Sequence, residues 1–465
     1  MRIYCDSNVF RKAKKTSKQF NQAAYNTLES LKDHFVFVFS EAHLSDLTKS
    51  QEDYRKEDLV LMERYVNNNY FCRDHIKKEF QILIATPTEA YDSKDFTAAD
   101  EFLDNPYDSM SKLFDFEGGE EYGKLFKSMF DLPIFPDNDL NIESAQPEHR
   151  ELLEQFKGVR TINDALKKFQ GVGQMLDSDT VFKKYKNLLL TYVDRSAYSY
   201  DEWEFEFDEK MKDTAFGKSF SEMVDLTMVE SDRSDEYTSF INTYVQLEFF
   251  GVTEERTGKK NKLKKNSHLD LNKDAAHAFF ASKTDYFVTD DIGVQTKAFI
   301  VYKLFNIQTK VLSVQDFIAR SMLLLKNEDT TASFYGGLSF SLKKGFIINQ
   351  SLQDQRQLIK LLYPVFNYYN RMQINQNKHG QSIQLFKSYE ISYGIMFAEI
   401  ALLIFKCERV FGRAIDLKDE KKISEFKEYE NGEFIRTWKH NGLDITLSWE
   451  KNTLEQSIIV LTMCF

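Results

Sequence analysis

The sequence predicts an α/β protein: a parallel sheet flanked by helices, interrupted by a mainly helical insertion and followed by a separate α+β domain. Two observations lead to this fold class. Short apolar runs alternate with helix-spaced apolar residues at the start of the chain and again after residue 236, which is typical of parallel strands buried on both faces. Only 18 Gly and 6 Pro occur in 465 residues, and this favours long helices over many tight turns.

The start of the chain contains two predicted strand–helix units. Residues 3–5 (IYC) form a short apolar run that ends at Asp6. Residues 10–34 place apolar side chains at three- and four-residue spacing, which predicts a helix. Residues 35–39 (FVFVF) predict a second strand, and helical spacing returns after Ser40. This order of elements predicts parallel pairing of the two strands.

The middle of the chain, residues 51–235, is predicted to be a mainly helical insertion. One apolar run in it, residues 80–85 (FQILIA), predicts a strand. Its amphipathic segments are interrupted where Gly or Pro occurs, at residues 105–106, 118–119, 132–133 and 135–136.

The α/β pattern resumes at residue 236. Predicted helices cover residues 237–250, a stretch that begins at Asp274, and residues 294–305. Predicted strands cover residues 285–289 and 309–314. We therefore expect residues 1–50 and 236–320 to form one discontinuous domain.

A separate α+β domain is predicted for residues 330–465. Asn441 and Gly442 stand between two β-rich runs, a pair typical of a tight hairpin. Residues 393–405 are apolar but too short for a membrane span and include Glu399, so they predict a buried helix. Strands are predicted at residues 333–342, 434–438, 444–449 and 455–463.

Composition excludes several classes of protein. Hydrophobic residues make up 42% of the chain, enough for packed cores, and no window suits a membrane span. The net charge of -11 argues against a general affinity for DNA or membrane surfaces. The cysteines are widely spaced and form no CxxC pair, which predicts free thiols in a reducing cytoplasm: Cys5, Cys72, Cys407 and Cys464.

Five acidic residues occupy one kind of position. Asp6 ends the first predicted strand, Asp46 lies in the helix after the second, Asp274 opens a predicted helix, and Asp290 and Asp291 end the strand of YFVTDD. Ligands of open parallel sheets bind beyond the carboxyl ends of the strands, so we expect these carboxylates to converge there. Carboxylates that lie close together repel one another unless a cation neutralises them. Oxygen ligands select hard ions, which predicts Mg²⁺ or Mn²⁺.

Three segments resemble the PIN-domain nucleases. They are MRIYCDSNVF, FVFSEAHLSDL and above all DAAHAFFASKTDYFVTDDIGVQTKA with the following NIQTKVLSVQDF. The resemblance covers residues 1–50 and 236–320 and implies metal-dependent hydrolysis of RNA. It implies an acidic set formed by Asp6, Asp46, Asp274 and Asp291. Two departures stand out: Asp46 occupies a position where the family usually has Glu, and Asp290 offers a competing carboxylate.

The resemblance suggests a role for each site residue. Asp6 and Asp291 are expected to be the principal metal ligands, with Asp274 and Asp46 as ligands or as groups that act through water, and Asp290 as the alternative to Asp291. For any single Asp, a helix cap is the competing interpretation. Neighbouring polar groups are expected to hold the carboxylates by hydrogen bonds: Ser7, Asn8, Ser40, His277 and Thr289.

His277 and a basic segment have two interpretations each. His277 lies one helical turn after Asp274 and shares its face, so it orients that carboxylate or moves a proton. A hydrogen-bonded interior histidine is the favoured alternative. The segment EERTGKKNKLKKN (254–266) is expected either to contact phosphates or to be a solvated loop, and its candidate phosphate-binding residues are Lys259, Lys260, Lys262, Lys264 and Lys265.

The sequence therefore predicts a cytoplasmic, metal-dependent endoribonuclease whose extra domains suit a toxin or a phage-defence effector. Its expected partners are RNA, a second copy of the chain or a regulatory protein, and no membrane. Two alternatives remain open at this point. One is a non-catalytic PIN-like scaffold that binds RNA or protein, and the other is a nuclease that cleaves DNA.

Overall fold

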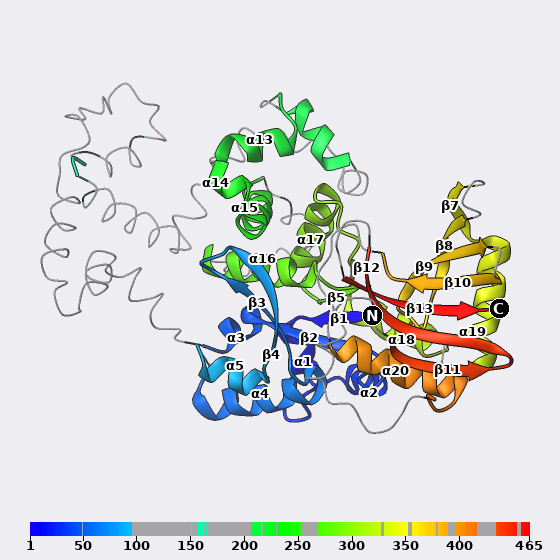
Figure 1. Ribbon diagram of the computed structural model, residues 1–465. Helices are drawn as coiled ribbons and strands as arrows, with labels where there is room; N and C mark the ends of the chain where they lie inside the picture. Colours follow the sequence, from blue (N-terminus) through cyan, green and yellow to red (C-terminus); the bar gives the residue numbers. More distant parts are fainter. Residues whose placement is uncertain are drawn as a thin grey trace, which may run out of the picture.

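Two sheets with their helices make up the described part of the molecule (Figure 1). This computed structural model describes residues 1–48, 50–94, 206–214, 217–228, 230–250, 252, 268–326, 330–351, 356–377, 380–388, 397–415, 434–452 and 457–465, together with residues 150, 157, 159–161 and 164. The predicted interruptions between residues 105 and 136 and the basic segment 254–266 lie outside these residues.

The first sheet has six strands in the order β4-β3-β2-β1-β5-β6. All neighbouring strands pair in parallel except β3 and β4, which are antiparallel. The α/β class and the parallel pairing of the first two strands are therefore confirmed. The strands are β1 (Arg2–Cys5), β2 (Val36–Ser40), β3 (Asn69–Asp74), β4 (Glu79–Ile84), β5 (Tyr286–Val288) and β6 (Lys310–Leu312).

Helices cover both faces of this sheet. Alternate residues of β1 enter opposite cores: Tyr4 packs with α15, α16 and α17, whereas Ile3 and Cys5 pack with α1, α2, α4 and α18. Both faces are thus apolar, which is why the strands appear as continuous apolar runs in the sequence. The helices around the sheet are α1 (Ser7–Ala13), α2 (Gln22–Leu31), α3 (Glu41–Leu47), α4 (Glu52–Val66), α5 (Pro87–Asp92), α15 (Glu236–Phe249), α16 (His268–Ala281), α17 (Ile292–Leu304) and α18 (Val314–Lys326).

Two helix predictions near the start of the chain and near Asp274 were wrong. The single helix expected at residues 10–34 is two helices, because α1 ends at Ala13 and Asn21 caps a new helix by accepting a hydrogen bond from the Ala24 N–H. The helix expected to begin at Asp274 begins at His268. Asp274 therefore lies inside α16 and is not its cap.

The first sheet extends into residues 51–235. β3 pairs with β2, and β4 pairs with β3, so residues 69–84 belong to the same sheet as β1. The strand predicted at residues 80–85 is confirmed as β4, whereas β3 (NYFCRD) was not predicted. Short helices follow within this range: α13 (Phe220–Thr227), α14 (Glu230–Arg233) and the 3-10 turn Met211–Asp213. The boundary proposed at residue 51 therefore does not coincide with an edge of the sheet.

The second sheet is antiparallel and has seven strands in the order β11-β12-β13-β10-β9-β8-β7. Its core is formed with α19 (Thr331–Lys344) and α20 (Phe397–Phe411), through residues such as Phe334, Leu338, Ile400 and Leu403. The strands are β7 (Phe346–Ser351), β8 (Arg356–Val365), β9 (Tyr369–Asn377), β10 (Gly380–Phe386), β11 (Phe434–His440), β12 (Leu443–Lys451) and β13 (Ser457–Cys464).

The last three strands and their hairpin are confirmed. Asn441 and Gly442 both have positive φ, 52° and 81°, as a tight hairpin requires. The strand predicted at residues 333–342 was wrong, because this stretch belongs to α19. Phe334 and Leu338, four residues apart, are buried on one face of that helix, and Thr330 caps it. The helix that contains Glu399 is confirmed as α20.

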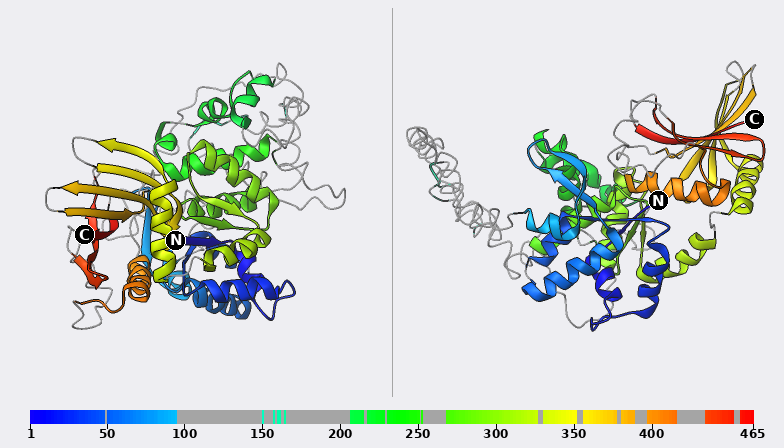
Figure 2. Two further views of the ribbon diagram at one scale, coloured as in Figure 1. Left: turned by 90° about the vertical axis from the view of Figure 1, so that its right-hand side faces the viewer. Right: turned by 60° about the horizontal axis from the view of Figure 1, so that its bottom comes forward.

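Buried ion pairs connect the two sheets. Arg2 on β1 donates to both carboxylate oxygens of Glu399 on α20, at 2.9 Å from Nε and 2.7 Å from Nη2, and each side chain is 1% exposed. Lys387, which follows β10, pairs with Asp285 at 2.7 Å, immediately before β5. Figure 2 shows α20 beside the start of β1, against the strands of the second sheet. The amino end of β1 is thus held by the second unit.

The remaining observations concern cysteines and membranes. All four cysteines are free thiols, as predicted. None of the helices in the described ranges has the length and apolar character needed to cross a bilayer.

The Arg2–Glu399 pair generates the first prediction. We expect Glu399→Ala to lower the free energy of unfolding by about 4 kcal/mol, because the Arg2 guanidinium would remain buried without its carboxylate. Chemical denaturation followed by intrinsic fluorescence measures the loss. Glu52→Ala, which removes an exposed pair with Lys56, is the control and is expected to leave stability unchanged. Equal effects of the two substitutions would contradict the prediction.

Candidate metal centre

Asp6 lies where β1 ends and α1 begins. Its backbone N–H donates to the carbonyl of Val288 at 2.9 Å, which joins the carboxyl ends of β1 and β5. Its carboxylate accepts hydrogen bonds from the Thr289 hydroxyl at 2.8 Å and from the backbone and side chain of Asn8, both at 3.4 Å. Asp6 is 8% exposed. The expected contacts of Asn8 and Thr289 with a carboxylate are therefore present.

Asp291 lies at the equivalent end of β5. Its carboxylate caps α17 by accepting from the Val294 N–H at 3.2 Å. Its own N–H donates to the Thr289 hydroxyl at 3.2 Å. Thr289 thus binds the Asp6 carboxylate and the Asp291 backbone at once and sets the two acids side by side at the sheet edge.

Asp274 joins these acids from α16, which packs on β1 and β5. Burial raises the pKa of its carboxyl to about 7. The charge of Lys297 opposes this shift, and the charges of Asp291 and Asp6 add to it. The charges of Asp291 and Asp6 therefore reach Asp274, although burial is the larger cause of the shift.

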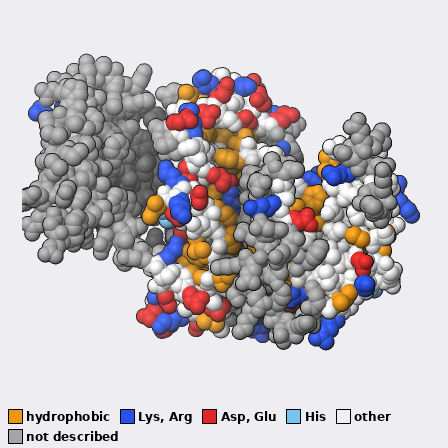
Figure 3. Space-filling model, in the orientation of Figure 1, with side chains coloured by type: hydrophobic (Ala, Val, Ile, Leu, Met, Phe, Trp, Pro, Cys, Tyr) orange, Lys and Arg blue, Asp and Glu red, His pale blue; other side chains and the backbone are white. Residues whose placement is uncertain are grey.

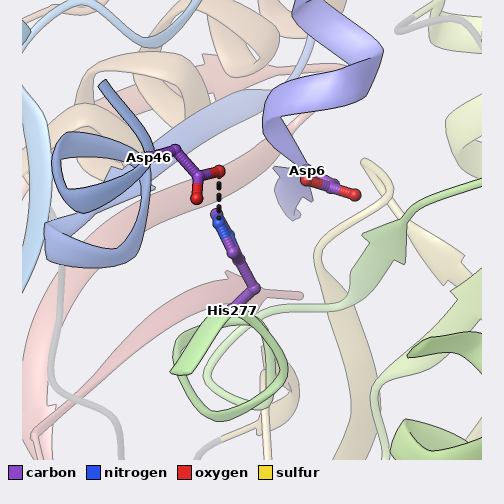
Figure 4. Close-up of side chains that lie close together, drawn as sticks. All are labelled: Asp6, Asp46 and His277. Atoms are coloured by element: carbon purple, nitrogen blue, oxygen red, sulfur yellow. Dashed lines mark hydrogen bonds and ion pairs between the residues drawn. The ribbon is translucent and has the colours of Figure 1, made fainter. Parts of the chain in front are cut away.

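Asp46 is held by two of the expected neighbours, Ser7 and His277. Its Oδ2 atom accepts from the Ser7 hydroxyl at 2.6 Å and lies 3.0 Å from Nε2 of His277 (Figure 4). Potential ligand atoms of Asp6, Asp46 and His277 all lie within 4.8 Å of one another. The hydrogen-bonded interior histidine is confirmed, but its carboxylate partner is Asp46, whereas the sequence pointed to Asp274.

The two groups of this pair shift each other's pKa. Burial alone would raise the pKa of Asp46, but the charge of His277 and the hydrogen bonds from His277 and Ser7 outweigh it, so the pKa lies well below 3.8. Burial alone would lower the pKa of His277, but the charge and hydrogen bond of Asp46 raise it above 6.5. Both shifts favour the charged forms of the pair, a carboxylate on Asp46 and an imidazolium on His277.

A chain of hydrogen bonds supports His277 from behind. Its Nδ1 atom lies 2.8 Å from the Tyr4 hydroxyl, which lies 2.6 Å from the Ser40 hydroxyl. His43 accepts from the Ser40 N–H at Nδ1, 3.1 Å away, so its Nε2 donates to the Cys5 carbonyl at 2.7 Å. Burial and the charge of His277 lower the pKa of His43 to about 3, which keeps this ring neutral. Ser40 therefore acts on Asp46 only through Tyr4 and His277.

Asp290 is engaged elsewhere. Its carboxylate accepts from the Val314 N–H at 2.7 Å, at the start of α18, and forms an ion pair with Lys12. Of the two adjacent acids, Asp291 is the one whose charge acts on Asp274. Asp290 is thus paired with Lys12 and α18, whereas the charge of Asp291 reaches Asp274, and which of the two would bind a metal stays a prediction.

The sequence interpretation missed a buried ion pair beside the acids. Lys297 on α17 lies 2.6 Å from Glu248 on α15, and the two side chains are 2% and 5% exposed. Lys297 has the largest charge effect on Asp274. In the sequence, Lys297 lies on the same helical face as Val294, Ala298 and Val301. A lysine on an apolar face predicts a buried acidic partner, because apolar faces seldom include unpaired charges.

The geometry separates the predicted residues into groups. Among the described residues, Asp6, Asp46 and His277 are the group whose ligand atoms lie within 4.8 Å of one another. Asp291 is joined to Asp6 through Thr289, and the charges of both act on Asp274. Asp46 and Glu248 also form ion pairs with His277 and Lys297. The predicted phosphate-binding lysines, Lys259 to Lys265, lie outside the described residues. Searches of protein-family models, curated proteins and solved structures find no match to this chain.

Asp274 generates a prediction about pH. The folded state keeps a proton on Asp274 up to about pH 7, whereas the unfolded state loses it near 3.8. Stability from this group is therefore full below pH 3.8 and is lost as pH rises through about 7. In the metal-free protein, we expect Asp274→Asn to become more stable than the wild type as pH rises, by a few kcal/mol at pH 8. Denaturation in EDTA across this pH range measures the difference.

A difference in stability that does not vary with pH would contradict the prediction. The control is Asp225→Asn, at an exposed position on α13.

The Asp46–His277 pair leads to a second prediction about the pH dependence of stability. The contribution of His277 is full below pH 6.5 and is lost as pH rises through its higher folded value, and that of Asp46 is lost as pH falls below 3.8. We expect His277→Ala to lower the free energy of unfolding by about 3 kcal/mol, most strongly between those two values, because Asp46 would be left charged without its partner. Denaturation at pH 5 and pH 9 tests this, and an equal or larger loss at pH 9 would refute it.

Proposed function

We propose that this chain is a PIN-like, divalent-metal-dependent nuclease that hydrolyses RNA phosphodiester bonds. The observation that supports this most is the grouping of acids at the carboxyl edge of a parallel sheet, where ligands of such sheets bind. Asp6 is joined to Asp291 through Thr289, lies with Asp46 and His277 in one cluster of potential ligands, and acts with Asp291 on the charge of Asp274. The choice of RNA depends on the resemblance of the sequence segments around these acids to PIN-domain nucleases.

The donor set fits Mg²⁺ or Mn²⁺. Asp6, Asp274 and Asp291 all offer carboxylate oxygens, which hard cations prefer. Burial raises the pKa of Asp274 to about 7 and the charges of Asp291 and Asp6 add to the shift, so a cation beside it would stabilise the ionised carboxylate. When bound, such a metal would supply an activated water and neutralise charge on the phosphate. Asp6 and Asp291 are preoriented by Thr289, so little ordering is needed when the cation arrives.

Two positively charged side chains near the acids, Lys297 and His277, are proposed to attract the substrate and not to bind the metal. Lys297 is held by Glu248, and His277 by Asp46, so neither is free to move into the space between the three acids. Both place fixed positive charge beside a negatively charged centre, which favours approach of a phosphate. In this proposal Glu248 positions Lys297, and Asp46 positions His277.

The biological role belongs to the same proposal. A nuclease-like sheet joined to a second unit suits a toxin or an antiviral-defence effector that acts in the cytoplasm. A homo-oligomer or a regulatory protein would then control access to the site.

One observation favours an alternative. Asp46 is neutralised by His277, which leaves fewer free acids than the family pattern implies. A non-catalytic PIN-like scaffold that binds RNA or protein would tolerate this loss. Cleavage of DNA is the second alternative, and it is tested by comparing RNA with DNA of the same sequence.

We expect the purified protein to cleave single-stranded RNA in Mn²⁺ or Mg²⁺ and to lose the activity in EDTA. Asp6→Asn combined with Asp291→Asn should lower the rate by about a thousandfold or more, because two of three cation ligands become neutral. Gel assays with RNA and DNA of the same sequence measure the rates. Calorimetric titration with Mn²⁺ should show binding to the wild type and not to the double variant.

Asp225→Asn, an exposed acid on α13, is the matched control and should cleave and bind Mn²⁺ as the wild type does. Equal cleavage by the double variant would show that the activity is a contaminant. Absence of carboxylate-dependent Mn²⁺ binding would favour the scaffold, and preference for DNA would overturn the choice of substrate.

A further inference from the structure

The first half of the second sheet differs in charge from the rest of the chain. Residues 331–389 contain seven Lys or Arg and one acidic residue, Asp354, although the whole chain has a net charge of -11. The same stretch is rich in Asn and Gln. A local excess of positive charge within an acidic protein marks a surface for a negatively charged partner.

The strand register assigns three of these cations, Arg356, Lys360 and Arg371, to one face of β8 and β9. Lys343 and Lys344 lie on α19, and Lys387 is buried in its pair with Asp285. Ile359, Met372 and Leu385 lie opposite one another on β8, β9 and β10 and pack into the core with α19 and α20. Their neighbours along each strand therefore point to the other face, because side chains alternate. At the right of Figure 3, where the second sheet lies, neutral polar groups and backbone predominate.

One row across that other face combines aromatic and basic side chains. Phe346 on β7 lies opposite Lys360 on β8, Lys360 opposite Arg371 on β9, and Arg371 opposite Phe386 on β10. Phe346 is 64% exposed, Lys360 is exposed and Arg371 is half-buried. Lys360 and Arg371 place two positive charges on adjacent strands, beside exposed Phe346, which favours a polyanion there.

The next row along the strands is made of amides. Gln373 on β9 donates to Gln384 on β10 at 3.2 Å, and Asn375 donates to the same Gln384 oxygen at 3.1 Å. Thr462 on β13 lies opposite Gln384 and continues the row. Amides and hydroxyls both donate and accept hydrogen bonds, so this row can bind the edges of bases and ribose hydroxyls.

Another cation completes the pattern. Arg356 lies four residues before Lys360 on β8, on the same face and opposite Asn375. The two cations are thus roughly 13 Å apart along the strand. In the part of the chain that the structure describes, neither Arg356 nor Lys360 forms an ion pair.

We infer that the face of β7–β10 opposite α19 and α20 binds single-stranded RNA. Phosphates contact Arg356, Lys360 and Arg371, and an unpaired base stacks on Phe346. An exposed aromatic ring can stack only on bases that are not already paired, which is why a duplex does not fit. The choice of RNA over DNA rests on the proposed function, but the binding surface does not require the metal centre.

The test measures binding without cleavage. A labelled single-stranded RNA of about 16 nucleotides is titrated with the full chain in EDTA at about 0.1 M salt, with fluorescence anisotropy as the readout. Lys360→Gln combined with Arg371→Gln should weaken binding about tenfold and lower the slope of log affinity against log salt by about 1.4. Phe346→Ala should weaken it about fivefold without changing that slope.

Lys439→Gln is the matched control. Lys439 is 76% exposed on β11, at the far edge of the same sheet, where it lies 3.7 Å from Asp444. This variant should bind RNA as the wild type does. The midpoint of thermal unfolding should be the same for all variants. If the double variant does not fold, the Lys360→Gln variant replaces it in the binding assay.

Several results would overturn the inference. Unchanged affinity of the Lys360 and Arg371 variant would do so, and so would an equal loss in the Lys439 variant. Tighter binding of DNA of the same sequence would overturn the choice of RNA, and equal binding of duplex RNA or of polyglutamate would overturn the single-stranded mode. Because EDTA removes the metal, failure here is distinguishable from failure of the nuclease proposal.

Discussion

Desolvation of the Asp274 carboxyl beside Asp291 and Asp6 is the constraint on which the acidic centre depends. At the carboxyl edge of the sheet, Asp6 is buried, whereas Asp274 and Asp291 are half-buried. Lys297 acts on Asp274, yet the pKa of that carboxyl still rises to about 7. Such a site costs stability unless a proton or a cation is bound, so the protein maintains it at the expense of its own folding. Functional sites are where such costs are expected.

The short strand β1 connects this site with the second unit. At its carboxyl end, Asp6 is bound to β5 through its backbone and through Thr289. At its amino end, Arg2 is bound to Glu399 of α20. Arg2 and Asp6 are only four positions apart in the sequence. A shift of α20 would therefore act directly on the strand that positions Asp6, which gives the second unit a physical route to the acidic centre.

The acidic centre and the basic sheet face have complementary chemistry. The centre is negative and suits a cation, whereas the face of β7–β10 offers positive charge and an exposed ring to an unpaired strand. An enzyme that cuts RNA must hold a polyanion near a negatively charged site, and a separate basic surface reduces that repulsion. The two proposals stand on different residues, so each can fail without the other.

Local sequence determined the parts that depend on near neighbours. Apolar runs located β1, β2, β4 and β5, the Asn441–Gly442 pair located a hairpin, and strand ends located Asp6 and Asp291. Local composition was misleading at α19, where only burial of Phe334 and Leu338 against the second sheet decides for a helix. The partners of the charged groups were also decided by tertiary structure: His277 binds Asp46 from 231 residues away, and Asp290 binds Lys12. Periodicity and caps act within a few residues, whereas the pairing of buried charges depends on which helices the packed cores bring together.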